Sequence, residues 1–328
     1  MRKRSTGSES LSGQLEDNRT YKVCVISFFD GVLEHHKSLL TYGSGLCADH
    51  RGELLVVVCN LNQLVCDNQT TTASLLTGEE RVDMIKSKGY HHTILCQLPP
   101  VQNTESNKQW KACQETLLRL SEIVVPGADL WHNKHFFNLQ KPGEVRHKHL
   151  YEKIDHQFKQ TSTNQHLEML QLLEQGRVEK MFSALGYAFP VSGYVVEGNK
   201  IGRTLGYPTA NLRIDDHNKA VPGQGVYTGL VNVAGKWYPS MINIGIRPTL
   251  DMEKVTIEAH LFHFEGNIYG ERVSIGFLKR IRDEMRFNSL SELKQQLHRD
   301  RDVATASLIQ QMNNVHTNAF VFAGIKSS

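Results

Sequence analysis

The chain has 328 residues, of which 40% are hydrophobic and 22% are charged, values that are ordinary for a globular protein. This length predicts about two domains, each large enough to bury a core. The formal net charge of +3 is too small to indicate a nucleic-acid partner. The sequence contains no run of about 18 apolar residues, so we expect no membrane span.

The start of the chain is polar. A basic start is followed by residues 5–20, which contain no apolar stretch of the kind found in secretory signals. We therefore expect a disordered tail over residues 1–20 and a cytoplasmic protein. The cysteines lack C-x-x-C spacing, so zinc and disulfide frameworks are not favoured. Three of them lie in apolar runs and are expected in the core: Cys24, Cys59 and Cys96.

From Tyr21 to about Ala128, short apolar runs alternate with helix-like stretches. The runs, typical of buried parallel strands, are Val23–Ile26, Leu54–Cys59, Thr93–Leu98 and Ile123–Val125. The helix-like stretches are His36–Cys47, Thr77–Lys88 and Lys108–Leu120. This alternation predicts a Rossmann-like open parallel α/β sheet, which usually binds ligands outside the carboxyl ends of its strands.

The segment Gln165–Leu185 has an apolar side at helical spacing, and Gly186 follows it as a stop. We expect this helix to connect two domains. Beyond it, strands separated by Gly, Pro and Asn turns are expected over Val191–Glu197, Val226–Val233, Lys236–Ile244, Val255–Phe264 and Ile268–Phe277. Successive strands with short turns predict an antiparallel barrel or sandwich. Two helices are expected after the strands, one from Ser289, which forms a capping-box pattern with Glu292, to about His298, and one over Val303–Met312.

Residues 198–211 read G-N-K-I-G-R-T-L-G-Y-P-T-A-N and are the most informative segment. Gly198, Gly202 and Gly206 allow a tight turn and the close approach of a ligand. Arg203 lies inside this glycine frame, where a guanidinium can hold phosphate oxygens through two hydrogen bonds.

The same segment ends in an extended stretch. Pro208 has a fixed φ and favours an extended Tyr207. Thr209 and Asn211 then point to the same side, because side chains in a strand alternate. A hydroxyl and an amide carbonyl are ligands suited to a Mg²⁺ ion that also holds nucleotide phosphates. The segment therefore predicts a magnesium–nucleotide site.

This segment resembles the flavokinase signature G-x-x-x-G-R-x-x-G-x-P-T-A-N of the riboflavin kinase family. Further segments are similar to motifs of that family in the same order: Pro222–Tyr227, Asn243–Thr249, Ile257–Phe264, Ile268–Glu271 and Phe277–Phe287. The resemblance implies a β-barrel with C-terminal helices that uses Mg²⁺ and ATP to convert riboflavin into FMN. It nominates as nucleotide- and phosphate-binding residues Gly198, Gly202, Arg203, Gly206, Pro208 and Thr209, and as metal ligands Thr209 and Asn211.

Glu258 matches the position of the catalytic base in the family motif E-x-H-L. Alternation supports this role, because Ile257 and Ala259 belong to an apolar face and leave Glu258 on the other face. A solvated strand glutamate is the alternative. The flavin-binding residues are expected in the last motif, as Arg280, Arg282, Glu284 and Phe287.

The first half resembles the FMN adenylyltransferase domain that bacteria fuse in front of a flavokinase. That family has G-x-F-D-G-x-H-x-G-H after its first strand, where the glycines shape a nucleotide loop and the histidines help to bind ATP phosphates. Here Leu33 replaces the first histidine and His35 replaces the inner glycine, while Ser27 replaces the leading glycine. Leucine cannot donate a hydrogen bond, and a side chain at the glycine position blocks close approach.

Two further motifs of that domain are altered. V-V-G-x-D-F-x-F-G survives only as the sequence Val124–Asn133, and S-S-T-x-I-R has no matching arginine at 165–170 or near Thr163. Leu76–Arg81 still resembles the family's scaffold helix. We therefore predict an adenylyltransferase-like domain that keeps its fold and lacks activity.

The predicted organisation is a tail over 1–20, an adenylyltransferase-like domain over 21–163, a linking helix over 164–186, a riboflavin kinase domain over 187–315 and a tail over 316–328. The leading functional hypothesis is an ATP-dependent riboflavin kinase with no second activity. The alternatives are a bifunctional FAD synthetase, which also adenylylates FMN, and a non-catalytic flavin-binding regulator. A regulator would not need magnesium ligands or a base.

Overall fold

The computed structural model describes residues 21–61, 73–98, 115–116, 121–127, 165–198, 201–214, 216–248 and 253–314. The chain divides into two compact units, Met1–Leu167 and Glu168–Ser328. The predicted terminal tails and most of the predicted helix over Lys108–Leu120 lie outside the described residues. None of the described helices combines the length and the apolar character that a membrane span needs.

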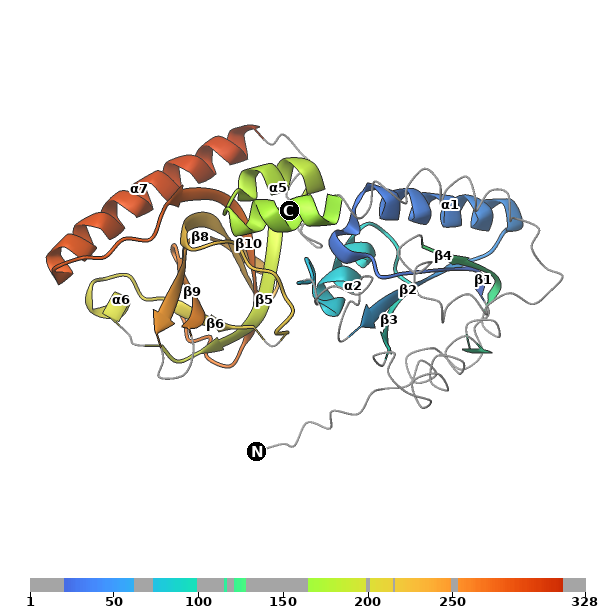
Figure 1. The fold of residues 1–328 in the computed structure, drawn as a ribbon, viewed down its shortest axis with the longest axis horizontal. Helices are drawn as coiled ribbons and strands as arrows, with labels where there is room; N and C mark the ends of the chain where they lie inside the picture. The colour runs from blue at the N-terminus through green and yellow to red at the C-terminus, as the bar shows by residue number, and fades with distance from the viewer. Residues whose placement is uncertain are drawn as a thin grey trace, which may run out of the picture. The chain divides into compact units, whose positions relative to one another are not determined.

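The first unit is built on a parallel sheet with the strand order β3-β2-β1-β4. Its elements are β1 (Tyr21–Ser27), η2 (Asp30–Val32), α1 (Glu34–His50), β2 (Leu54–Leu61), α2 (Gly78–Ser87), β3 (Thr93–Leu98) and β4 (Ser121–Pro126). α1 packs against β1, and α2 packs against β2 and β3 (Figure 1). The predicted open parallel sheet is confirmed.

Local sequence accounts for these elements. The apolar runs of β1 and β2 are buried on both faces, as expected for strands covered by helices. Cys24 of β1, Cys59 of β2 and Cys96 of β3 are buried free thiols. α2 begins with a capping box, in which the Glu80 N–H donates to the Thr77 hydroxyl and the Thr77 N–H donates to the Glu80 carboxylate.

The second unit is a closed barrel with the strand order β10-β5-β6-β9-β8-β7, all antiparallel. Its elements are α5 (Val178–Leu185), β5 (Phe189–Val196), α6 (Ile201–Thr204), β6 (Ala210–Arg213), β7 (Gly225–Val233), β8 (Lys236–Pro248), β9 (Glu253–Leu261), β10 (Arg272–Arg282) and α7 (Leu290–Asn314). β10 pairs with both β5 and β7 and so closes the barrel. The predicted antiparallel barrel is confirmed.

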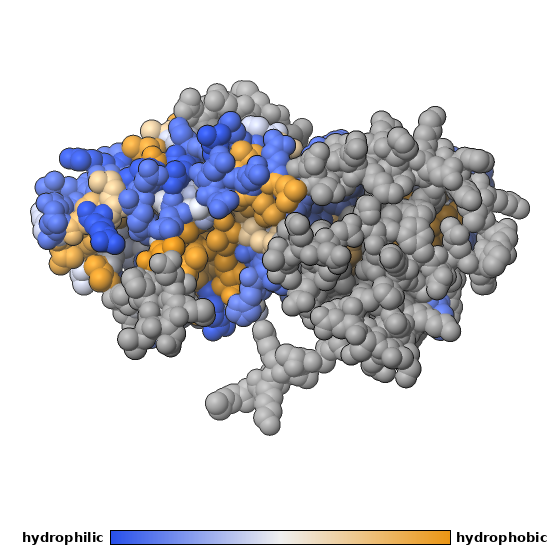
Figure 2. All heavy atoms as spheres, in the orientation of Figure 1, coloured by the Kyte–Doolittle hydropathy of each residue, from blue (hydrophilic) through white to orange (hydrophobic). Residues whose placement is uncertain are grey.

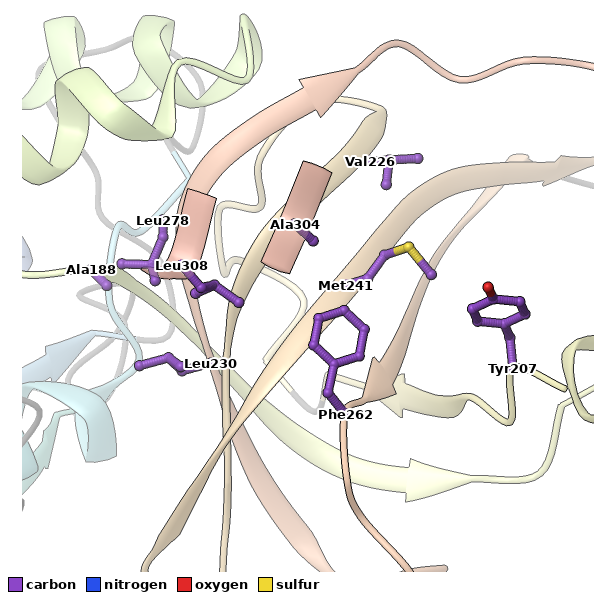
Figure 3. Packing of buried hydrophobic residues seen from close by; sticks show 9 residues of the cluster. All are labelled: Ala188, Tyr207, Val226, Leu230, Met241, Phe262, Leu278, Ala304 and Leu308. Carbon is purple, nitrogen blue, oxygen red and sulfur yellow. The ribbon is translucent and has the colours of Figure 1, made fainter. Parts of the chain in front are cut away.

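α7 covers part of the outside of the barrel, against β7, β8 and β10 (Figure 1). Hydrophilic side chains cover most of its visible face in Figure 2. Its opposite face contributes Ala304 and Leu308 to a buried cluster with Tyr207, Met241 and Phe262 (Figure 3). Burial of this apolar face fixes the helix on the barrel.

The predicted single helix over Gln165–Leu185 is two helices, one over 165–174 and α5. The break lies at Gly176, whose φ of 68° is left-handed. A Cβ at this position would lie 2.5 Å from the Tyr227 hydroxyl and 2.8 Å from the Arg280 Nε, so only glycine fits. Tertiary contact with the barrel therefore interrupts a helix that local sequence favours.

Two other predictions need correction. The strand expected over Ile268–Phe277 begins only at Arg272, because Gly270 has a left-handed φ of 79° and the residues before it form a turn. The two expected C-terminal helices are the single helix α7, since neither Gly nor Pro interrupts residues 298–303. The Ser289 hydroxyl accepts from the Glu292 N–H as predicted, while the Glu292 carboxylate accepts from Asn288.

Candidate active site

Within the described part of the signature segment, residues 201–207 form a tight turn that precedes β6. α6 contains Arg203, and the Tyr207 N–H returns to the Gly202 carbonyl at 2.7 Å. A Cβ on Gly202 would lie 2.3 Å from the Tyr207 carbonyl oxygen, and Gly206 has a φ of 88°. Both positions therefore require glycine for the turn itself.

β6 carries the end of the signature into the barrel. Asn211 lies directly opposite Glu258 of β9, and Glu258 lies directly opposite Asn243 of β8. Directly opposed residues of antiparallel strands share one face of the sheet, so the three side chains form a row. The Thr209 hydroxyl donates to a Glu258 carboxylate oxygen at 3.3 Å. The structure thus brings together Thr209, Asn211 and Glu258, which the sequence nominated.

Gly198 leaves room for this row. A Cβ at Gly198 would lie within 2.2–2.5 Å of the amide atoms of Asn211. Any larger residue would displace the Asn211 side chain. Gly202 and Gly206 therefore serve the turn, whereas Gly198 leaves space for the side chain of an expected metal ligand.

His260 contacts the turn at Tyr207 and Pro208. Its Nδ1 lies 2.8 Å from the Pro208 carbonyl oxygen, so Nδ1 carries the proton of this hydrogen bond. The imidazole also meets the Tyr207 ring edge-on, with ring centroids 5.1 Å apart. Burial lowers the pKa of His260; the bond to Pro208 raises it, and Arg301 lowers it further. The neutral ring is therefore favoured, and it fixes the residue before Thr209.

A pocket with a volume of about 650 Å³ opens beside this turn. Gly206 and Pro208 of the signature line one part of it, and His260 lines it beside them. The remaining lining residues belong to β8, to the end of β9 or to the segment after β9: Lys236, Tyr238, Leu261, His263, Phe264 and Glu265. The pocket therefore places two residues of the signature beside aromatic and charged residues of β8, β9 and the segment after β9.

Arg203 is exposed on α6. Within the part of the chain that the structure describes, its guanidinium forms no ion pair. An exposed guanidinium on a glycine-framed turn suits the oxygens of an anionic ligand.

The expected flavin-binding residues divide into two groups. The Glu284 carboxylate accepts from the Asn243 amide at 3.4 Å and so reaches the row that contains Glu258. Phe287 lies 6.0 Å from the Arg282 guanidinium carbon. Arg282 itself donates to both oxygens of Asp300 on α7. Glu284 therefore connects the loop after β10 to the row that contains Glu258, while Arg282 connects the start of that loop to α7.

Arg280 is engaged within the barrel unit. Its guanidinium donates to the Gln224 carbonyl at 2.6 Å and pairs with Asp283 at 2.8 Å. The backbone N–H of Arg280 donates to the Glu179 carboxylate. Gly225 leaves space for this side chain, since a Cβ there would lie 3.0 Å from its Nε. These contacts join α5, the start of β7 and β10.

Three residues of this region were not nominated from the sequence: Asn243, Tyr207 and His298. Asn243 belongs to the N-I-G motif, but only the strand register shows that it faces Glu258. Tyr207 occupies a variable position of the signature, and its hydroxyl lies 2.8 Å from the His298 Nδ1. No spacing rule connects residues 207 and 298, so this contact had no signal in the sequence.

In the first unit, the turn after β1 is organised around the Asp30 carboxylate. It accepts from the backbone N–H groups of Leu75 and Leu76 at 3.0 and 2.8 Å. It also lies 3.4 Å from the Arg81 guanidinium and 2.9 Å from the His166 Nε2. Burial would raise the pKa of Asp30, but Arg81, His166 and the Leu76 N–H lower it well below its ordinary value.

The residues that depart from the adenylyltransferase pattern fill the same turn. Leu33 is buried at the start of α1, and His35 is buried beside it. The His36 Nδ1 accepts from the Leu33 N–H at 3.1 Å, so this ring caps the helix of its own chain. The rings of His35 and His36 pack with centroids 3.8 Å apart. The altered motifs near Asn133 and Thr163 lie outside the described residues.

Comparisons with known proteins agree with both halves of this description. The profile of the family described as riboflavin kinase matches residues 185–308. The bifunctional riboflavin kinase/FMN adenylyltransferase of Buchnera aphidicola subsp. Schizaphis graminum is 31% identical over 296 residues, covering 85% of this chain and 91% of that protein. The Bacillus subtilis protein of the same name is 27% identical over 302 residues, covering 88% and 93%. A crystal structure described as a macrolide-efflux protein from Streptococcus pneumoniae superimposes with a TM-score of 0.62 at 26% identity, covering 88% of this chain and 95% of that one.

Proposed function

The chain belongs to the bifunctional riboflavin kinase/FMN adenylyltransferase family, and we propose that its barrel unit transfers the γ-phosphate of ATP to the 5′-hydroxyl of riboflavin. The products are FMN and ADP. The observation that carries this proposal is the row of Asn211, Glu258 and Asn243, with the Thr209 hydroxyl hydrogen-bonded to Glu258. These residues supply a carboxylate beside the neutral oxygen ligands Thr209 and Asn211, which follow the glycine-framed arginine in sequence.

Glu258 is the proposed general base. It takes the proton of the riboflavin 5′-hydroxyl as that oxygen attacks the γ-phosphorus and the bond to the β-phosphate oxygen breaks. The Thr209 hydroxyl donates to this carboxylate, which fixes its direction. A strand position gives the base a rigid support, as phosphoryl transfer depends mainly on positioning.

Thr209 and Asn211 are the proposed ligands of a Mg²⁺ ion. Their donors are a hydroxyl and an amide oxygen, with the Glu258 carboxylate beside them, and these hard oxygen donors fit the ion. The ion would neutralise charge on the phosphates. Gly198 supports this assignment, because it leaves the space that the Asn211 amide occupies.

The pocket beside Gly206 and Pro208 is the proposed nucleotide site. Its aromatic side chains Tyr238 and Phe264 suit a flat base, and Arg203 on the adjoining turn suits the phosphates. Riboflavin would approach from the loop after β10, where Glu284 reaches the Glu258 row and Phe287 offers an aromatic surface.

The first unit is proposed to lack adenylyltransferase activity. Leu33 and His35 fill the turn in which the resemblance places a phosphate-binding histidine and a glycine, and His36 caps α1. A bifunctional enzyme is the second candidate, because the relatives that align with 85% and 88% of this chain carry that name.

One incubation tests both candidates. Purified protein is given riboflavin, ATP and Mg²⁺, and FMN and FAD are separated by chromatography. We expect FMN in equal amount to ADP and no FAD. Absence of FMN would overturn the kinase proposal, and FAD formed as fast as FMN would replace it with the bifunctional one.

A further inference from the structure

One turn of α7 contacts the segment that precedes the proposed metal ligand. The His298 Nδ1 lies 2.8 Å from the Tyr207 hydroxyl, and the two rings meet edge-on with centroids 5.5 Å apart. Tyr207 is buried, so its ring has a fixed place. Pro208 and Thr209 follow it directly, and the chain between the phenol and the Thr209 hydroxyl is therefore short and stiff.

The same turn of α7 contacts the segment on the flavin side. Asp300 is only 1% exposed, and its carboxylate accepts from Arg282 Nε and Nη2 at 3.0 and 2.7 Å. The Gln296 amide donates to the same carboxylate at 2.8 Å. Arg282 also donates to the Asp283 carbonyl at 2.7 Å and lies over the Phe287 ring. One buried carboxylate thus orders the start of the loop that carries Glu284.

Helix geometry explains how neighbouring residues reach two different loops. Residues two apart on an α-helix point about 200° apart, so His298 and Asp300 diverge. Residues four apart share a face, which places Gln296 against Asp300. Ala304 and Leu308, buried in the cluster of Figure 3, hold α7 on the barrel.

We propose that the α7 turn from Gln296 to Asp300 is a brace that positions both substrates, with His298 acting on the nucleotide segment through Tyr207 and Asp300 acting on the flavin segment through Arg282. This inference rests on the proposed kinase function. His298 and Asp300 are positioning residues, since each acts through another side chain. The brace predicts that their effects on the two substrates are separable.

Steady-state kinetics of the full chain test this separation. His298→Ala is expected to raise KM for ATP about three- to tenfold, the effect of one lost hydrogen bond, and to leave KM for riboflavin within about twofold. Asp300→Asn is expected to do the reverse. His298→Asn keeps a polar group near the position of Nδ1 and should restore much of the ATP affinity.

A double-mutant cycle tests the path through Tyr207. Tyr207→Phe removes the other partner of the same hydrogen bond, so it should raise KM for ATP as His298→Ala does, and the double variant should be no worse than either single one. Arg299→Ala is the matched control, because this exposed residue lies on the same turn between His298 and Asp300. It should change neither KM.

Equal changes in both KM values for each variant would overturn the brace, as would additive losses in the cycle. If Asp300→Asn fails to fold, Gln296→Ala tests the same carboxylate more mildly, and an unchanged KM for riboflavin would count against the proposal.

Calorimetric binding of riboflavin and of ADP with Mg²⁺ separates this inference from the proposed function. A chain that binds both ligands with the expected selectivity but forms no FMN keeps the brace and loses the kinase assignment. A chain that binds neither ligand overturns both.

Discussion

Asn211 lies directly opposite Glu258 across the antiparallel β6–β9 pair, and the Thr209 hydroxyl donates to the same carboxylate at 3.3 Å. Strand pairing therefore brings the Glu258 carboxylate to a hydroxyl and an amide that lie about fifty positions earlier in the sequence. This relationship links the proposed metal ligands to the proposed base, and it makes their separate roles testable.

Glu258→Gln should lower kcat by about 10²–10⁴-fold, the range usual for a positioned acid–base group. The amide keeps the shape of the side chain and an acceptor for Thr209, so riboflavin binding should persist. Stopped assays for FMN give kcat, and flavin fluorescence gives the affinity. Glu271→Gln, at an exposed position of the barrel unit, is the control. A loss of tenfold or less would leave Glu258 with a structural role only.

Thr209→Ala should raise the Mg²⁺ concentration needed for half-maximal activity by about tenfold, which corresponds to ~1.4 kcal/mol. The reason is the loss of one oxygen donor beside Asn211. Thr209→Ser keeps the hydroxyl and should behave nearly like the natural protein. Magnesium titrations at saturating ATP and riboflavin make the comparison. Identical titration curves for the Ala variant and the natural protein would exclude Thr209 as a ligand.

FMN supplied with ATP and Mg²⁺ should not yield FAD. Each missing phosphate contact costs about 1.5–3 kcal/mol, and Leu33 and His35 remove two features of the site at once. Because such losses need not add, the rate is measured directly by chromatography of the products. A relative with an intact G-x-F-D-G-x-H-x-G-H motif serves as the positive control. FAD at a rate close to that of FMN formation would contradict this prediction.

Asp30→Ala should destabilise the first unit by about 3–5 kcal/mol, because it leaves the buried Arg81 guanidinium without its carboxylate. The pKa of Asp30 is lowered in the folded state from its ordinary value of 3.8. Its contribution is therefore fully present above that value and is lost as the pH falls through the folded pKa. Calorimetric unfolding scans of the natural protein and the variant should converge in strong acid. Parallel curves down to the lowest pH would contradict the assignment.

A chain of residues 168–328 should keep kinase activity, whereas a chain of residues 182–328 should melt at a lower temperature. The shorter chain loses Val178 and Met181, which are fully buried, and each such side chain contributes about 1.5–3 kcal/mol. It also loses the Glu179 carboxylate that accepts from the Arg280 N–H. Thermal unfolding and FMN formation are measured for both chains. Equal melting temperatures would show that residues 168–181 contribute nothing to the stability of the barrel unit.

Periodicity and turn residues were sufficient to predict most of the fold. The apolar runs of β1 and β2 and the helix-like stretch that begins at Thr77 are local signals, and the structure uses them as local elements. The break at Gly176 could not be read in the same way, since it depends on the Tyr227 hydroxyl of a distant strand. The contact between Asp300 of α7 and Arg282 of β10 is equally non-local, and the sequence does not identify it.

The site could be predicted only in part for the same reason. Thr209 and Asn211 are close in sequence, so alternation alone places them on one face. The position of Asn243 beside Glu258 follows from the register of β8 and β9, a non-local property. Arg282 was expected to bind flavin, but its guanidinium donates to Asp300. The position of an arginine in the sequence does not distinguish one that pairs with a carboxylate of its own chain from one that binds a ligand.

The contacts of the Asp30 carboxylate explain how the first unit can lose ligand binding in evolution and still keep its fold. The chain itself occupies both of its oxygens, since Leu75 and His166 contact one oxygen while Leu76 and Arg81 contact the other. The side chain that shapes this turn is thus a different one from Leu33 and His35, at which the resemblance expects ligand contacts. Fold maintenance and ligand binding fall on separate residues of a single turn, and selection can abandon the second while the first is kept.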